Sequence, residues 1–75
     1  MDKASQKQVN FIFQRIQLTG TPHMVQIIIS QEDSLKHIEA LDKWSASMLI
    51  DAINAMDDHK FDDVYYGYQV QGDNK

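Results

Sequence analysis

The sequence predicts a small, mainly α-helical domain with an extended C-terminal segment. Apolar residues recur at helical spacing, helix-capping residues precede these segments, and 75 residues form one small core at most. We expect three principal helices near residues 4–18, 22–31 and 43–57. A single domain should span residues 1–71, and residues 72–75 should form a frayed tail.

The first helix is predicted from one apolar stripe between two capping signals. Ser5 can cap its start, and Gly20 suits its C-terminal cap. The stripe follows the i, i+3, i+4, i+7 pattern and consists of Val9, Ile12, Phe13 and Ile16.

The segment 22–31 can be read in two ways. Pro22 after a Thr21 cap is typical of a helix start. The same stretch is rich in β-branched residues, and its alternation would also suit a strand. We favour a helix, with a short helical turn over residues 34–40 for which Asp33 and Ser34 offer caps.

The third helix should begin after Asp42, which we expect to be its cap. Its apolar arc covers more than half of the circumference, which is typical of a helix central to a core or an interface. The main apolar side comprises Ala46, Leu49, Ile50, Ile53 and Met56.

The C-terminal segment has a different period. Val64, Tyr66, Tyr68 and Val70 alternate with other residues, which predicts a strand or an extended arm. An α+β fold is therefore the alternative, with a small two-stranded sheet formed by residues 24–30 and 64–70.

Composition and charge exclude or disfavour several classes of function. The net charge is −4, and it is split between +2 over residues 1–31 and −6 over residues 32–75. The acidic half disfavours nucleic-acid binding, because phosphate neutralisation supplies most of that affinity. There is no cysteine, no pair of histidines four residues apart and no glycine-rich phosphate loop. We expect no enzyme activity, no cofactor, no metal and no membrane contact, and we expect a cytoplasmic location.

Two phrases of the sequence resemble a family of small helical modules. Residues 4–12, ASQKQVNFI, are similar to an opening helix of the form T/S-x-K-Q-x-x-Y/F-I. Residues 41–53, LDKWSASMLIDAI, are similar to L-T-K-x-E-A-S-x-L-I-D-x-L. Such modules occur in phage and mobile-element proteins, often associated with DNA recombination or replication proteins. The resemblance implies a helical module that works around DNA metabolism or host takeover, without catalytic residues.

The chain departs from that pattern at the start of the second phrase. Asp42 replaces the usual Thr cap, and Trp44 stands at a position that is normally polar. Ser45 occupies the place of the Glu that would close a capping box.

Several apolar residues are candidates for contact with a partner protein. Phe11 and Leu18 lie nearly opposite the stripe of the first helix, because each residue advances about 100°. Each candidate could instead pack within the domain, and the two-sided helices could also complete the core of an obligate homodimer. The predicted partner-binding residues are Phe11, Leu18, Trp44, Tyr65, Tyr66 and Tyr68.

Charged residues offer two further hypotheses. An acidic group could steer a basic partner or simply be solvated, and its first two members would lie unfavourably at a helix C-terminus. This group comprises Asp57, Asp58, Asp62 and Asp63. A weak nucleic-acid-binding module remains the alternative function, and it would use Lys3, Lys7 and Arg15.

Overall fold

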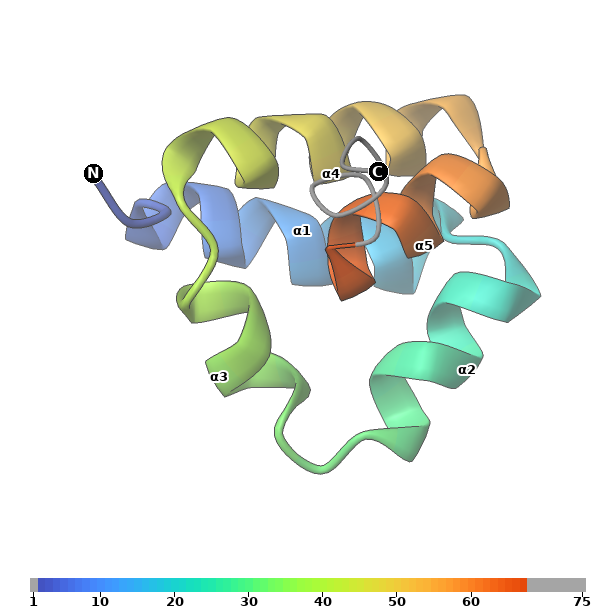
Figure 1. The fold of residues 1–75 in the computed structure, drawn as a ribbon. Helices are drawn as coiled ribbons and strands as arrows, with labels where there is room; N and C mark the ends of the chain where they lie inside the picture. Colours follow the sequence, from blue (N-terminus) through green and yellow to red (C-terminus); the bar gives the residue numbers. More distant parts are fainter. Residues whose placement is uncertain (1, 68–75) are drawn as a thin grey trace, which may run out of the picture.

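Five helices make up most of residues 2–67, which are the residues that the computed structural model describes (Figure 1). They are α1 (Gln6–Thr19), α2 (Pro22–Ser30), α3 (Ser34–Glu39), α4 (Lys43–Ala55) and α5 (Asp58–Tyr66). Within these residues no strand occurs, and the only bridge of β type joins Lys3 to Asp42. The mainly helical prediction is thus confirmed, and the α+β alternative is wrong because residues 24–30 belong to α2 and 64–66 to α5.

The ends of α1 are fixed as the sequence predicts. The Ser5 hydroxyl accepts a hydrogen bond from the Gln8 backbone N–H (3.1 Å), and the Gln8 side chain accepts one from the Ser5 N–H (2.9 Å). This is a capping box, and it satisfies two backbone donors at once. At the other end Gly20 donates to the Ile16 carbonyl, and a Cβ at Gly20 would lie only 2.6 Å from that oxygen. Gly20 is therefore required by close approach, since its φ of −66° is open to any residue.

The caps of α2 and α4 are also confirmed. Thr21 accepts from the Met24 N–H (3.2 Å) ahead of Pro22, and the Asp42 carboxylate accepts from the Ser45 N–H (2.7 Å). For α3 the expectation is only partly right. Asp33 occupies the capping position, but its side chain makes no capping hydrogen bond.

Helices α1 and α4 lie side by side and run in the same direction (Figure 1). Gln8 contacts Ser47 near their starts, and Arg15 Nε donates to Asn54 Oδ1 (3.0 Å) near their ends. In Figure 1, α1 and α5 lie between α4 and the pair formed by α2 and α3. The core collects apolar side chains from all five helices, including Ile12, Met24, Ile38, Leu49 and Phe61.

Helix α5 overturns the predicted extended C-terminal segment for residues 64–66. Asp57 caps this helix by accepting from the Lys60 N–H (3.0 Å), and Gly67 ends it with a φ of 74°. Phe61, Val64 and Tyr65 are buried at positions i, i+3 and i+4, so burial follows a helical period rather than alternation. The remainder of the predicted strand, with Tyr68 and Val70, lies outside the described residues.

The same helix corrects the electrostatic expectation for Asp57 and Asp58. Asp57 is the N-cap of α5 and Asp58 its first residue, although the Asp57 N–H also donates to the Ala52 carbonyl at the end of α4. The helix dipole therefore favours their negative charge. None of the helices within residues 2–67 is both long enough and apolar enough to cross a membrane.

Candidate interaction surface

An exposed tryptophan borders a shallow apolar hollow. Trp44 is the second residue of α4, and 64% of its surface is exposed. Tyr66, at the end of α5, is exposed beside the same hollow, whose volume is about 230 Å³. We call this hollow the Trp44 pocket, and its lining comprises His37, Leu41, Trp44, Ser45, Asp63, Val64, Tyr65, Tyr66 and Gly67.

Three elements build the Trp44 pocket. His37 comes from α3, Trp44 from α4 and Tyr66 from α5, and Leu41 lies in the connection between α3 and α4. The Asp42 cap fixes the first turn of α4, where Trp44 lies. The Leu41 carbonyl accepts from the Ala4 N–H (2.8 Å), so the N-terminal segment holds this connection in place.

Tyr65 forms the floor of the pocket and is not an exposed contact residue. Only 1% of its surface is exposed, and its ring stacks on His37 and Phe61 with centroids 4.2 and 5.5 Å away. Its hydroxyl donates to the Gln31 side-chain oxygen. Burial, followed by the neighbouring Tyr66, raises the pKa of the Tyr65 hydroxyl above its ordinary value. The expectation that Tyr65 offers its side chain on the surface is therefore wrong.

His37 belongs to the pocket although no sequence pattern pointed to it. Its Nε2 lies 2.5 Å from the Tyr65 carbonyl oxygen. A carbonyl can only accept, so Nε2 carries the proton and donates. This bond satisfies a carbonyl in the last turn of α5 and joins α3 to α5.

Phe11 and Leu18 lie on a different surface. Both are exposed on the outer face of α1, opposite the buried Val9–Ile16 side, as the helical geometry predicts. The Arg15 guanidinium lies 5.6 Å from the centre of the Phe11 ring. Neither residue lines the Trp44 pocket. The structure thus brings Trp44, Tyr65 and Tyr66 together and leaves Phe11 and Leu18 apart, while Tyr68 lies outside the described residues.

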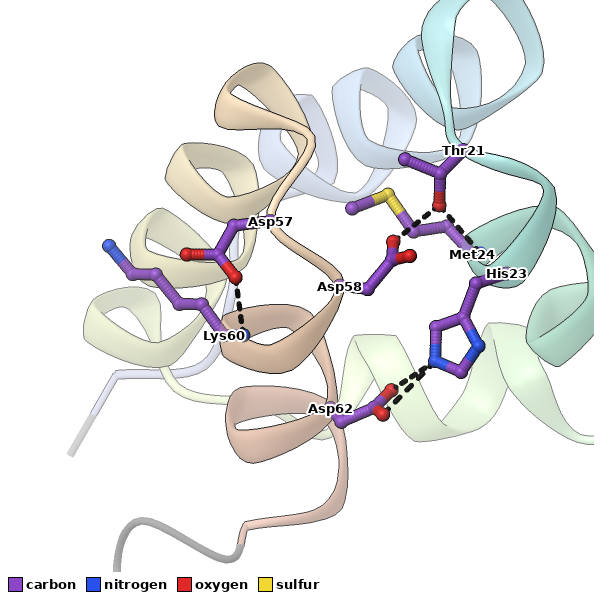
Figure 2. A network of polar contacts seen from close by, with 7 residues as sticks. All are labelled: Thr21, His23, Met24, Asp57, Asp58, Lys60 and Asp62. Atoms are coloured by element: carbon purple, nitrogen blue, oxygen red, sulfur yellow. Dashed lines mark hydrogen bonds and ion pairs between the residues drawn. The ribbon is translucent and has the colours of Figure 1, made fainter.

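The four acidic residues all have partners within the chain, and Figure 2 shows three of them. Asp57 caps α5, and Asp58 accepts from the Thr21 hydroxyl (2.5 Å). Asp62 lies 2.8 and 3.0 Å from His23 Nε2, and Asp63 lies 3.9 Å from His59 Nε2. Through their contacts with Thr21 and His23, Asp58 and Asp62 therefore join α5 to the start of α2. Only Asp63 also lines the Trp44 pocket.

The Asp62 carboxylate raises the pKa of His23. The hydrogen bond to Asp62 is the main cause, and the charges of Asp62 and Asp58 add to it. The charged form of His23 is thus favoured in the folded state. This gives the α2–α5 contact a dependence on pH.

The three basic residues of the nucleic-acid alternative lie along the N-terminal segment and α1. Lys3 and Lys7 are exposed, whereas Arg15 is partly buried and donates to Asn54. Lys3 lies beside Asp42 in the β-bridge. The nucleic-acid alternative remains a prediction.

Within residues 2–67 no group of three or more His, Asp or Glu residues could hold a metal ion.

Three further apolar residues are exposed although the sequence did not mark them as contact residues, namely Ile29, Leu35 and Met56. Ile29 could have been found once residues 22–31 are read as a helix, because it lies about 160° from the buried Ile27.

Comparisons with family models, with curated proteins and with solved structures found no match for this chain.

Proposed function

We propose that this chain is a small accessory protein that acts by binding another protein at the Trp44 pocket. The observation that carries the proposal is the exposure of Trp44 beside Tyr66 and an apolar hollow. Tryptophan and tyrosine are enriched among the residues that dominate binding energy at interfaces.

The size of the hollow supports a protein partner. Sites for small molecules usually enclose about 300–1,000 Å³, whereas the Trp44 pocket is an open hollow of about 230 Å³. It suits one or two apolar side chains projecting from a partner. Because Asp63 lines the pocket, a partner with a basic residue next to the inserted side chain would be favoured.

The proposal also covers the process and the cellular location in which the protein acts. The resemblance of residues 4–12 and 41–53 to phage and mobile-element modules supports an accessory or regulatory role near DNA metabolism or a host protein. We place the protein in the cytoplasm and assign it no catalytic step. A direct contact with nucleic acid through Lys3, Lys7 and Arg15 is the competing hypothesis.

The test uses site-specific photo-crosslinking in cells, with the crosslinking amino acid at Tyr66, followed by identification of the protein attached. The partner, once purified, is titrated against the wild type, Trp44→Ala and Leu35→Ala. Leu35 is a matched control because it is an exposed apolar residue that does not line the pocket. Trp44→Ala should weaken binding at least about 30-fold, the loss typical of a hot-spot residue, and Leu35→Ala should leave it unchanged.

Trp44 also supplies a direct signal, since it is the only tryptophan of the chain. Its fluorescence should shift to shorter wavelength when a partner covers it. An equal loss of affinity for both variants, or no change in fluorescence on binding, would contradict the proposal. Salt-dependent binding of labelled DNA that Lys7→Glu abolishes would instead favour the nucleic-acid hypothesis.

A further inference from the structure

A second apolar hollow lies between α1 and α2. Its volume is about 290 Å³, and its lining comprises Phe13, Ile16, Gln17, Val25, Ile28 and Ile29. We call it the α1–α2 groove. Five of these side chains are apolar, and Ile29 projects at the rim with 72% of its surface exposed.

No ionised side chain lines the groove, and all of its lining except Phe13 comes from a stretch of the sequence without such residues. Residues 16–31 contain no Asp, Glu, Lys or Arg, although such residues make up 24% of the sequence. The nearest along the chain are Arg15 and Glu32. Within the stretch only His23 titrates, and its ring is held by Asp62 of α5 instead of lining the groove.

This lack of charge favours a second copy of the chain as the occupant. Two copies, each with a net charge of −4, repel one another at any acidic face. At the α1–α2 groove they can approach with apolar surfaces and neutral Gln17 alone. A strongly basic or acidic partner would gain no complementary charge there.

The shape of the face also suits self-association. A two-fold symmetric contact uses the same surface on both copies, so the surface must complement itself. Here one face carries both a groove and a projecting side chain, Ile29. A two-fold axis near Ile29 would direct the Ile29 of each copy to the groove of the other.

From these observations we propose that the α1–α2 groove is the contact surface of a weak homodimer, with Ile29 of each copy seated in the groove of its partner. Helix α2 has nine residues and is about 13 Å long. The contact is therefore smaller than the ~800 Å² per partner of standard interfaces, and we expect a micromolar dissociation constant. This surface is separate from the Trp44 pocket, so the proposal does not depend on the proposed function.

The experiment is sedimentation equilibrium of the full chain over a wide concentration range, with Ile29→Lys and Leu35→Lys as a matched pair. Both changes place a lysine at an exposed apolar position and reduce the magnitude of the negative net charge, from −4 to −3. Weaker repulsion alone would strengthen association in both variants. We expect Leu35→Lys to dimerise at least as well as the wild type, and Ile29→Lys to dimerise about 100-fold more weakly, because it buries two unpaired charges per dimer.

Salt provides an independent check. Raising sodium chloride from about 50 to about 500 mM should leave the dimer intact or strengthen it, because no ion pair crosses the contact. Circular dichroism of each variant confirms that the helices are retained. If Ile29→Lys unfolds, Ile29→Gln, which adds no charge, should still weaken the dimer at least about 10-fold.

Three outcomes would overturn the proposal. The first is a wild-type chain that stays monomeric up to about 1 mM, a concentration at which even millimolar affinity would be visible. The second is an Ile29→Lys variant that dimerises as well as Leu35→Lys, since the contact would then lie elsewhere. The third is a monomer that binds phosphatidylcholine vesicles through Ile29, which would make a lipid surface the occupant.

Discussion

His23 joins two helices that are far apart in the sequence. Its Nε2 contacts both carboxylate oxygens of Asp62, at 2.8 and 3.0 Å, next to the contact between Thr21 and Asp58 (Figure 2). These polar contacts fix the first turn of α2 against α5. The same acids would look like a free charged surface if only the sequence were considered.

The raised pKa of His23 predicts how stability depends on pH. A raised folded-state pKa means that protonated His23 stabilises the fold. The contribution is fully present below the ordinary value of 6.5 and is lost as the pH rises through the raised value. We therefore expect the free energy of unfolding, measured by urea denaturation, to fall as the pH rises from 6.5 through the raised pKa of His23.

His23→Gln should remove this part of the pH dependence. His59→Gln is the matched control, because His59 is exposed and lies 3.9 Å from Asp63. A His23→Gln variant whose stability follows the same pH profile as the wild type would show that the pair with Asp62 contributes nothing.

Trp44 lies on the surface of α4 and not in the core. The sequence left open whether Trp44 packs in the core or lies on the surface. Its position in the first turn of α4 and its 64% exposure remove it from the core. The core of α4 is formed instead by Ala46, Leu49, Ala52 and Ile53.

Among the elements, α5 differs most from the sequence-based expectation. Alternation in Val64, Tyr66, Tyr68 and Val70 favoured an extended arm. A competing signal lies a few residues earlier, where Asp57 precedes a helical repeat of Phe61, Val64 and Tyr65. The helix forms because this repeat buries three large side chains, and its cap supplies a partner for the Lys60 N–H.

The cap of α5 is therefore a point at which the helix can be weakened. Asp57→Ala should cost about 1 kcal/mol of stability, as is typical for the loss of an N-cap. Asp57→Asn should cost much less, because its side-chain oxygen can still accept from the Lys60 N–H. Thermal denaturation of both variants checks the difference, and equal losses would contradict a capping role.

In the molecule as a whole, the most extensive helix packing is that of α4 against α1 and α5. Helix α4 contacts α1 on one side and α5 on another, and four of its residues are buried. Most of the predicted apolar side of α4 thus lies in the core, whereas Met56 is exposed. The small residues Ala46 and Ala52 are fully buried, which allows the neighbouring helices to approach closely.

A core this small should tolerate little loss of packing. Leu49 is fully buried, so Leu49→Ala should cost about 3–5 kcal/mol. A chain of this length is stable by only about 4–11 kcal/mol. We expect a large fall in the urea midpoint, against a change within about 0.5 kcal/mol for exposed Leu35→Ala. A loss below about 1 kcal/mol for Leu49→Ala would mean that the core is looser than the structure indicates.

Local signals in the sequence determined the helices up to residue 55 and most of their caps. Ser5, Thr21 and Asp42 act on backbone groups three residues away, and the apolar stripes follow from helical period alone. Interactions of such short range can be predicted from the sequence without knowledge of the tertiary structure. The uneven charge and the charge-free stretch over residues 16–31 are likewise properties of the sequence.

Only the tertiary structure decided which side chains reach the surface and which acids are paired. Tyr65 of α5 is buried because His37 of α3 stacks on its ring. Trp44 is exposed because no described helix covers the first turn of α4 on that side. His23 and Asp62 are 39 residues apart, and the packing of α2 on α5 brings them together. Contacts of this kind depend on how helix faces combine, which no local pattern of residues specifies.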